Sequence, residues 1–234
     1  MQNVIFKDLG TIDYKKAWDF QEKLFNEAIN QKIKGNNILN YLLFCEHPHV
    51  YTLGRNGKKE NLLISEEQIR LINASYYHIN RGGDITYHGP GQIVVYPIFD
   101  LEELGLTLKQ YIENLEQIII DCLADYNITA GRLAGATGVW LDSGIKGRER
   151  KICAIGVRIS RFVTMHGLAF NVNTNLDYFN YINPCGFVDK GVTSMKEELK
   201  KEQSLDEVKQ NLLKHFTRSL HLSEFVINRS LTSV

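Results

Sequence analysis

Hydrophobic residues recur at helical spacing in three stretches of the chain, near residues 14–28, 108–126 and 204–216. Apolar residues three and four positions apart share one face of a helix, so each stretch predicts an amphipathic helix. The pattern is clearest in the second stretch. Its apolar face comprises Leu108, Tyr111, Ile112, Leu115, Ile118, Ile119, Cys122 and Leu123.

Two of these helices also have a recognisable start. Thr107 is followed three residues later by Gln110, and Ser204 is followed three residues later by Glu207. This spacing is typical of a capping box, in which the two side chains bond each other's backbone N–H groups. We therefore expect helices to begin directly after Thr107 and Ser204.

Short runs rich in β-forming residues lie between the helical stretches. They occupy residues 40–46, 76–79, 92–99, 138–141, 151–159 and 161–172. The last two runs abut at Ser160 and Arg161, which predicts a tight hairpin. Strands mixed with helices, some of them joined by hairpins, predict an α/β or α+β fold with a mixed β-sheet flanked by helices. The chain has no repeat, low-complexity tract or Pro/Gly/Ser-rich linker, so we expect residues 1–234 to form a single domain.

Composition and charge narrow the functional class. Hydrophobic residues make up 44% of the chain, and 27 basic residues balance 27 acidic ones. Zero net charge argues against a dedicated nucleic-acid binder. No run approaches the ~20 apolar residues that span a bilayer, and the N-terminus lacks the plan of a signal peptide. We expect a soluble, cytoplasmic protein that binds neither nucleic acid nor membrane.

One local cluster of positive charge stands out against this balance. The segment 145–151 contains Lys146, Arg148, Arg150 and Lys151. A solvated loop and a docking site for an acidic partner explain such a run equally well.

The four cysteines are widely spaced, with no CxxC pair, so neither a disulfide framework nor a metal site is expected. Cys45, Cys122 and Cys153 stand in apolar segments and are expected to act as small buried hydrophobes. Cys185 differs, because it lies between Pro184 and Gly186 in a predicted turn. Backbone N–H groups in such a turn can stabilise a thiolate or an oxyanion, which makes Cys185 the candidate nucleophile.

Two other segments carry candidate chemistry. The segment 81–92, RGGDITYHGPGQ, places Arg, Asp, Tyr and His among four glycines between two strand-like runs. It predicts either a substrate-binding loop or a long hairpin connection. Lys151 opens an otherwise apolar strand, where a lysine usually extends its amine to solvent. Further along, His166 is more typical of a satisfied core histidine than of a catalytic one.

Together these segments resemble the lipoyl(octanoyl) transferase family. The similarity covers roughly residues 40–200 in the family's order, with small departures at Cys153 and Phe170. The matching motifs are HPHVYTLGR at 47–55, RGGDITYHGPGQ at 81–92, KICAIGVR at 151–158, HGLAFNV at 166–172, PCGF at 184–187 and GVTSM at 191–195.

The resemblance implies a fold like the catalytic domain of biotin and lipoate protein ligases, and an acyltransferase activity without cofactor or metal. The donor would be octanoyl-acyl-carrier protein. The acceptors would be lysines on the lipoyl domains of 2-oxoacid dehydrogenase complexes and on the glycine-cleavage H protein. This reaction is the first step of endogenous protein lipoylation.

The resemblance also implies roles for individual residues. Cys185 matches the cysteine that carries the acyl thioester, and Lys151 matches the lysine that lowers the pKa of that cysteine. The remaining matches would form the walls of the substrate site. They are Arg81, Gly82, Gly83, Asp84, Ile85, Thr86, Tyr87, His88, Ala154, Ile155, Gly156, Gly167, Leu168 and Ala169.

These roles have a physical requirement. A free thiol with a pKa of ~8.5 is only a few per cent thiolate at neutral pH, and an ammonium within ~4–6 Å would lower that pKa by about a unit or more. We therefore predict that Lys151 and Cys185 converge. Three rival functions remain at this point: an ATP-dependent lipoate or biotin-type ligase, a thiol hydrolase, and an inactive binding module for lipoyl domains.

Overall fold

A nine-stranded mixed sheet forms the centre of the computed structural model, which describes residues 4–183, 190–220, 222 and 226–227. The strand order is β12-β1-β2-β6-β10-β9-β8-β7, and β11 pairs with β9 outside this path. The strands are β1 (Val4–Thr11), β2 (Asn40–Glu46), β6 (Gln92–Ile98), β7 (Gly131–Leu133), β8 (Ala136–Leu141), β9 (Arg150–Ser160), β10 (Val163–Asn171), β11 (Gly191–Val192) and β12 (Val226–Ile227). Parallel pairs (β12–β1, β1–β2, β11–β9) and antiparallel pairs share one sheet, which confirms the mixed topology.

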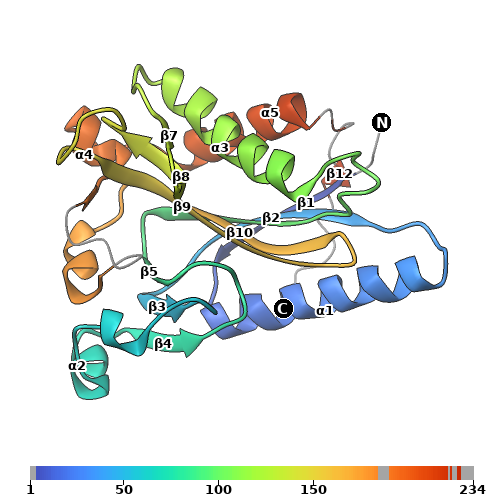
Figure 1. Ribbon diagram of the computed structural model, residues 1–234, viewed down its shortest axis with the longest axis horizontal. Coiled ribbons are helices and arrows are strands. Elements are labelled where there is room, and N and C mark those ends of the chain that lie inside the picture. The colour runs from blue at the N-terminus through green and yellow to red at the C-terminus, as the bar shows by residue number, and fades with distance from the viewer. Residues whose placement is uncertain (1–3, 184–189, 221, 223–225, 228–234) are drawn as a thin grey trace.

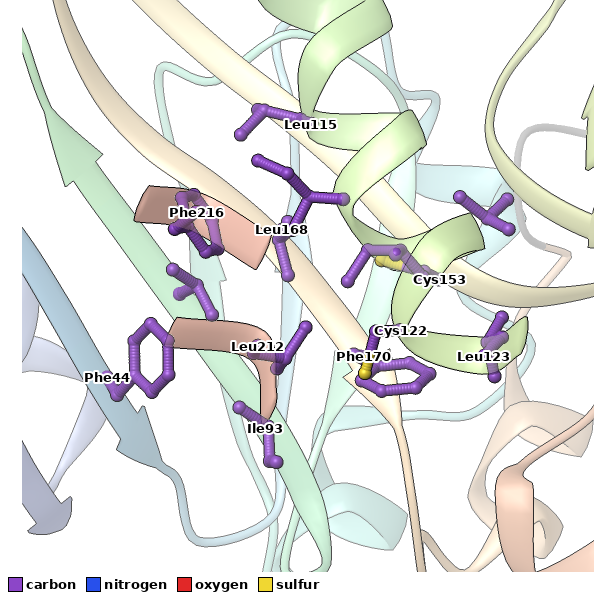
Figure 2. Close-up of a cluster of buried hydrophobic side chains, with 14 of the residues drawn as sticks. Phe44, Ile93, Leu115, Cys122, Leu123, Cys153, Leu168, Phe170, Leu212 and Phe216 are labelled. Carbon is purple, nitrogen blue, oxygen red and sulfur yellow. The ribbon is translucent and has the colours of Figure 1, made fainter. Parts of the chain in front are cut away.

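Helices cover both faces of this sheet (Figure 1). Helices α3 (Leu108–Ala124) and α5 (Leu205–Ser219) lie on one face, and the long helix α1 (Tyr14–Ile33) lies on the other. Figure 2 shows the core under α3 and α5, where Cys122 and Leu212 pack over Phe170. A second core on the opposite face joins Phe25 of α1 to Met165 of β10. The layered α/β arrangement therefore follows from one apolar stripe on each helix.

The predicted helix starts are confirmed. Thr107 and Gln110 make both bonds of the capping box at the start of α3. At the start of α5, the Ser204 hydroxyl accepts from the backbone N–H of Glu207 at 3.4 Å. Helix α1 continues to Ile33, beyond the predicted stretch, and near its end Lys32 pairs with Asp100 at 2.6 Å.

A smaller three-stranded sheet lies beside the main one, in the order β4-β3-β5. Its strands are β3 (Val50–Leu53), β4 (Ser75–His78) and β5 (Ile85–His88), and its flanking helices are η1 (Lys59–Asn61) and α2 (Glu66–Leu71). Strand β5 is unexpected, because the glycine-rich segment 81–92 predicts an irregular loop or connection. Its four residues are ordered by antiparallel pairing with β3 rather than by their local sequence.

The predicted hairpin between β9 and β10 is confirmed. Ser160 pairs with Val163, so that only Arg161 and Phe162 form the turn. Both turn residues have positive φ, at 48° and 62°, as two-residue hairpin turns matched to strand twist require. Strand β10 therefore begins at Val163 rather than at Arg161.

Two short helices complete the part of the chain that the structure describes. They are η2 (Leu176–Tyr181) and α4 (Met195–Leu199), and they stand on either side of residues 184–189, which lie outside the described ranges. Among the described residues, no helix is long and apolar enough to cross a membrane.

Candidate active site

A cavity of about 450 Å³ lies between strands β9 and β10 of the main sheet and strand β5 of the small sheet. All of the residues expected in the walls of the substrate site line it, except Tyr87. The structure thus brings Arg81–Thr86, His88, Ala154–Gly156 and Gly167–Ala169 together, although they come from three separate segments. Apolar side chains from elsewhere, including Val94, Ile112 and Val157, complete the lining.

The glycine-rich segment closes this cavity by crossing strand β9. The N–H of Gly82 donates to the carbonyl of Val157 at 2.9 Å. A Cβ on Gly156 would lie 2.8 Å from the Gly82 carbonyl oxygen, and one on Gly167 would lie 2.1 Å from the Val95 carbonyl oxygen. Small residues beside a sheet can leave room for an acyl chain, but the space beside these two glycines is filled by the protein's own backbone. Their smallness permits assembly of the cavity walls.

Arg81 and Asp84 hold the crossing segment in place. The buried Arg81 guanidinium donates to the carbonyl of Thr52 at 2.7 Å and to the Thr52 hydroxyl at 3.0 Å. Asp84 accepts from the side-chain amide of Asn61 at 2.5 Å and from the N–H of Ile85 at 2.6 Å. Both side chains therefore tie the cavity wall to β3 and to η1.

One end of the cavity is polar but carries neutral imidazoles. His88 lies 2.9 Å from the Gln92 side-chain oxygen, and burial, assisted by the neighbouring His47 and the Arg81 charge, lowers its pKa to about 3. His166 lies 2.9 Å from the Asn80 oxygen, and burial likewise lowers its pKa to about 3. Both rings are uncharged at neutral pH.

His166 departs from the expectation of a satisfied core histidine. It is only 2% exposed, as expected, but it lines the cavity. Its Nε2 is bonded to Asn80, whereas its Nδ1 has no hydrogen-bond partner among the described residues. One ring nitrogen therefore remains for a bound molecule.

Sequence reasoning missed three residues at this end. Tyr14 and Tyr96 line the cavity, and His47 lies behind them, 2.7 Å from the Tyr96 hydroxyl. Burial lowers the pKa of His47 to about 4. Tyr14 and Tyr96 appear in the sequence only as apolar positions of a helix and a strand. The signal for His47 was the HPHVYTLGR motif, from which no site residue was assigned.

Tyr87 points away from the cavity. Its hydroxyl lies 2.7 Å from Nδ1 of His49, and its ring stacks on Tyr178 with 5.0 Å between centroids. Strand residues alternate between faces, so Tyr87 faces the aromatic core of the small sheet while its neighbours Thr86 and His88 line the cavity. Tyr87 therefore packs in the aromatic core of the small sheet, beneath the cavity wall.

Lys151 lines the cavity at the start of β9. Its Nζ donates to the carbonyl of Thr137 at 3.2 Å and lies 4.6 Å from the centre of the Trp140 ring. Strand β9 is bulged at this point, since Val139 and Trp140 pair with Cys153 and Lys151 and leave Ile152 as the extra residue. Such a bulge re-aims a side chain, and here the half-buried Lys151 lies in the cavity lining, with its amine bonded to the exposed Thr137.

Cys185 lies outside the described residues, so its distance from Lys151 is not given by the structure. The described chain on both sides of it nevertheless reaches the cavity. Phe179 and Val192 line the cavity, and Val192 of β11 pairs directly with Lys151. The N–H of Thr193 also donates to the Lys151 carbonyl at 2.9 Å.

The other three cysteines are buried, as expected. Cys45, Cys122 and Cys153 are free thiols with no exposed surface. Burial raises the pKa of all three, that of Cys122 to about 12. They are therefore poor nucleophiles at neutral pH. Among the described residues, no group of three or more His, Cys, Asp or Glu side chains could hold a metal ion.

The basic segment 145–151 divides into two parts. Arg150 makes two bonds of 2.8 Å to the Glu198 carboxylate and also bonds Asp142, so it fastens α4 to β9. Lys146 and Arg148 are exposed. Arg148 also lies 3.5 Å from the Asp142 carboxylate, an exposed ion pair of the kind that contributes little to stability. These two side chains are therefore the ones available for a docking surface.

Comparison with known proteins identifies a family that this chain matches. The model of the lipoyl protein ligase A/B catalytic domain matches residues 13–217. An octanoyltransferase of Bacteroides fragilis is 57% identical over 208 residues, which cover 89% of this chain and 94% of the relative.

Two solved structures show the same fold at low identity. A bipartite lipoate protein ligase from Thermoplasma acidophilum has a TM-score of 0.70 at 16% identity, covering 97% of this chain and 87% of that chain. A biotin protein ligase from Aquifex aeolicus has a TM-score of 0.53 at 15% identity, covering 94% of this chain and 71% of that chain. The fold expected from the sequence motifs is confirmed.

Proposed function

Because this chain belongs to the lipoyl protein ligase A/B catalytic-domain family and is an octanoyltransferase, we propose that it carries the acyl group as a thioester on Cys185. The proposed donor is octanoyl-acyl-carrier protein. The proposed acceptors are lysines on the lipoyl domains of 2-oxoacid dehydrogenase complexes and on the glycine-cleavage H protein. The reaction needs a free thiol, so we place it in the cytoplasm, where thiols stay reduced.

The observation that carries this proposal is the position of Lys151. Its amine lies in the wall of the largely apolar cavity, and β11 pairs with Lys151 only seven residues after Cys185 (192 minus 185). The chain that follows Cys185 therefore returns to Lys151, the one lysine among the described residues that line the cavity. We infer that the Cys185 thiol comes within the ~4–6 Å of this ammonium at which the thiolate form is favoured.

The first half-reaction exchanges one thioester for another. The Cys185 thiolate attacks the carbonyl carbon of the acyl thioester on the carrier, and the carrier's thiolate leaves and takes the proton of the Lys151 ammonium, which leaves Lys151 as a neutral amine. The bond broken and the bond formed are of the same kind, so the exchange is nearly balanced in free energy and needs no ATP. Lys151, as an ammonium, stabilises the attacking thiolate.

The second half-reaction forms an amide. The acceptor lysine attacks the enzyme thioester as a neutral amine, the Cys185 thiolate leaves, and Lys151 accepts the proton that the acceptor nitrogen loses. An amide is more stable than a thioester, so this step is downhill. Donor and acceptor meet the same cysteine in turn, which predicts ping-pong kinetics.

The apolar part of the cavity suits the acyl chain. Val94, Ala154 and Ala169 line it on the sheet face that α1 covers, and each buried methylene contributes about 0.8 kcal/mol to binding. The neutral His88 and His166 at its polar end place no charge against the chain.

The exposed Lys146 and Arg148 are the proposed docking residues for an acidic carrier. Reversing both charges should raise the Michaelis constant for the carrier, and an unchanged constant would refute this part.

The main alternative is an ATP-dependent ligase of the same fold, which would activate free octanoate as an acyl-adenylate and needs no cysteine. High identity to an octanoyltransferase across the chain supports the transferase instead. ATP-dependent transfer of free octanoate by the purified protein would favour the ligase. Release of free octanoate from the carrier without acceptor would favour a thiol hydrolase.

The test is a single-turnover experiment with octanoyl-carrier protein and no acceptor, read by intact-mass spectrometry. Wild type should gain one octanoyl group, Cys185→Ala none, and Lys151→Met should acylate at least 100-fold more slowly. Cys153→Ala is the matched control and should acylate at the wild-type rate. An adduct that survives Cys185→Ala would refute the assignment of the nucleophile.

A further inference from the structure

We propose that Glu116 of α3 and Arg132 of β7 form a charge pair that positions the Lys151 ammonium through a shared peptide group and sets the pH range of acyl transfer. This inference rests on the role proposed for Lys151. Neither residue touches the cavity, so both act as positioning residues.

One peptide group connects the two sites. The carbonyl of Thr137 accepts from Lys151 Nζ at 3.2 Å, and the N–H of Gly138, which belongs to the same peptide group, donates to Glu116 Oε1 at 3.0 Å. The peptide also packs closely on the lysine, since a Cβ on Gly138 would lie 3.5 Å from Lys151 Cε. A carboxylate on the N–H side polarises the peptide and strengthens its carbonyl as an acceptor.

Glu116 is an unusual residue for its place in the fold. It is 6% exposed on a helix face whose other buried residues are Tyr111, Leu115, Ile118, Ile119, Cys122 and Leu123. A buried carboxylate is costly unless it is paired, and packing of α3 does not require one. Its bond to the peptide that contacts Lys151 supplies a reason for its presence.

Arg132 fixes the carboxylate. Its Nε donates to Glu116 Oε2 at 2.9 Å, so that the two oxygens of Glu116 have separate partners. Its Nη2 donates to the carbonyl of Glu113 at 2.8 Å and to Gln117 Oε1 at 3.1 Å. The guanidinium is thereby locked against the helix, and the carboxylate keeps one orientation.

The charged and titratable groups around Lys151 come from several elements. Glu116 approaches from α3 and Arg132 from β7. Cys153 follows Lys151 by two residues on β9, and its pKa is raised by burial, lowered by the charge of Lys151 and raised by that of Glu116. Asp84, on the crossing segment, also lines the cavity. At the β9–β11 pairing, Arg150 is paired with Glu198, and Lys190 lies 3.8 Å from Glu149.

The pair predicts opposite effects of its two charges. The negative charge of Glu116 favours the ammonium form of Lys151, and the positive charge of Arg132 opposes it. Acylation of Cys185 requires the ammonium, so its rate falls at high pH, where Lys151 loses its proton. Removing the Glu116 charge should move this fall to lower pH, whereas removing the Arg132 charge should move it to higher pH.

The experiment measures the single-turnover acylation rate against pH for wild type, Glu116→Gln and Arg132→Gln. We call the fall in rate at high pH the alkaline limb. We expect it to move by about half a pH unit or more, to lower pH in Glu116→Gln and to higher pH in Arg132→Gln. Glu113→Gln is the matched control: it makes the same chemical change on the same helix, at a side chain 47% exposed, and should leave the limb in place. Thermal unfolding of each variant reports folding separately.

A merely structural role would lower the rate at every pH without moving the limb, and that result would overturn the inference. Shifts in the same direction for both variants would also overturn it. Two further results test the proposed function by itself. Wild type must form the acyl-enzyme on Cys185, and Lys151→Met must lack the fall in acylation rate at high pH. If wild type fails there, the proposed function has failed; if only the variants fail to shift, the positioning role alone is refuted.

Discussion

The surroundings of Lys151 hold its amine in the cavity lining, although Lys151 stands at the start of an apolar strand. A lysine at the start of an apolar strand normally extends to solvent. Here the bulge at Ile152 re-aims it, and the Thr137 carbonyl and the Trp140 ring receive its amine. Neither feature has a local signature, because the bulge depends on how β8 and β9 align. The motif identified Lys151 as important, but sequence alone did not predict what holds it.

Buried neutral histidines give the protein a specific response to acid. Burial lowers the pKa of His47 to about 4, and of His88 and His166 to about 3, below the value near 6.5 of an unfolded chain. The unfolded chain therefore takes up protons first as pH falls. The stability tied to these residues is complete above about pH 6.5 and is lost as pH falls toward about 3 to 4.

We expect the free energy of unfolding to drop by up to about 2 kcal/mol per buried histidine between pH 7.5 and pH 5. Urea unfolding at the two pH values measures this drop. His166→Gln should show a smaller drop than wild type, because one of the three titrating groups is gone. An equal drop in both proteins would contradict the assignment of His166 as a buried neutral group.

Helix α3 was the element best predicted by the sequence. Its apolar residues keep helical spacing over the whole length, and its capping box is local chemistry that needs no tertiary contact. Strand β5 is the opposite case. Its residues ITYH stand among glycines, and only pairing with β3 makes them a strand. Strand β1 was missed for a related reason: its exposure pattern along residues 4–11 does not alternate.

The capping box of α3 offers a test at this scale. Thr107→Ala removes the hydroxyl that accepts from the Gln110 N–H, and it should lower the free energy of unfolding by about 1 kcal/mol. Thr107→Ser keeps the acceptor and should lose much less. Urea unfolding of the two variants measures the difference, and an equal loss would show that the hydroxyl bond is not the source of the stability.

At the scale of the whole molecule, the cavity is a product of long-range assembly. Tyr14 comes from α1, Tyr96 from β6 and Ile112 from α3, and no sequence motif connects them. The motifs predicted the walls made by segments 81–88, 154–156 and 167–169 with the exception of Tyr87, whose side chain faces the other side of β5. Strand alternation could have separated Tyr87 from its neighbours, had β5 been recognised as a strand.

The size of the cavity should determine chain-length preference. Ala154 lines the cavity and pairs with Ala169 across β9 and β10, so Ala154→Leu adds bulk where the acyl chain is proposed to lie. We expect transfer of octanoyl to fall at least tenfold while transfer of butyryl changes little. Acylation rates with butyryl, hexanoyl and octanoyl carriers measure this. An equal decline for all three would place the chain elsewhere.

The central place of β10 in the sheet has a consequence for how the molecule opens. Its residues Val163–Asn171 are all buried, with Leu168 and Phe170 in the core under α3 and α5 and Met165 and Ala169 in the core under α1. Backbone amides in such a strand exchange with deuterium only when the whole sheet comes apart. The wall that β10 gives to the cavity therefore belongs to the slowest-exchanging part of the protein, and partial opening at the edges leaves it intact.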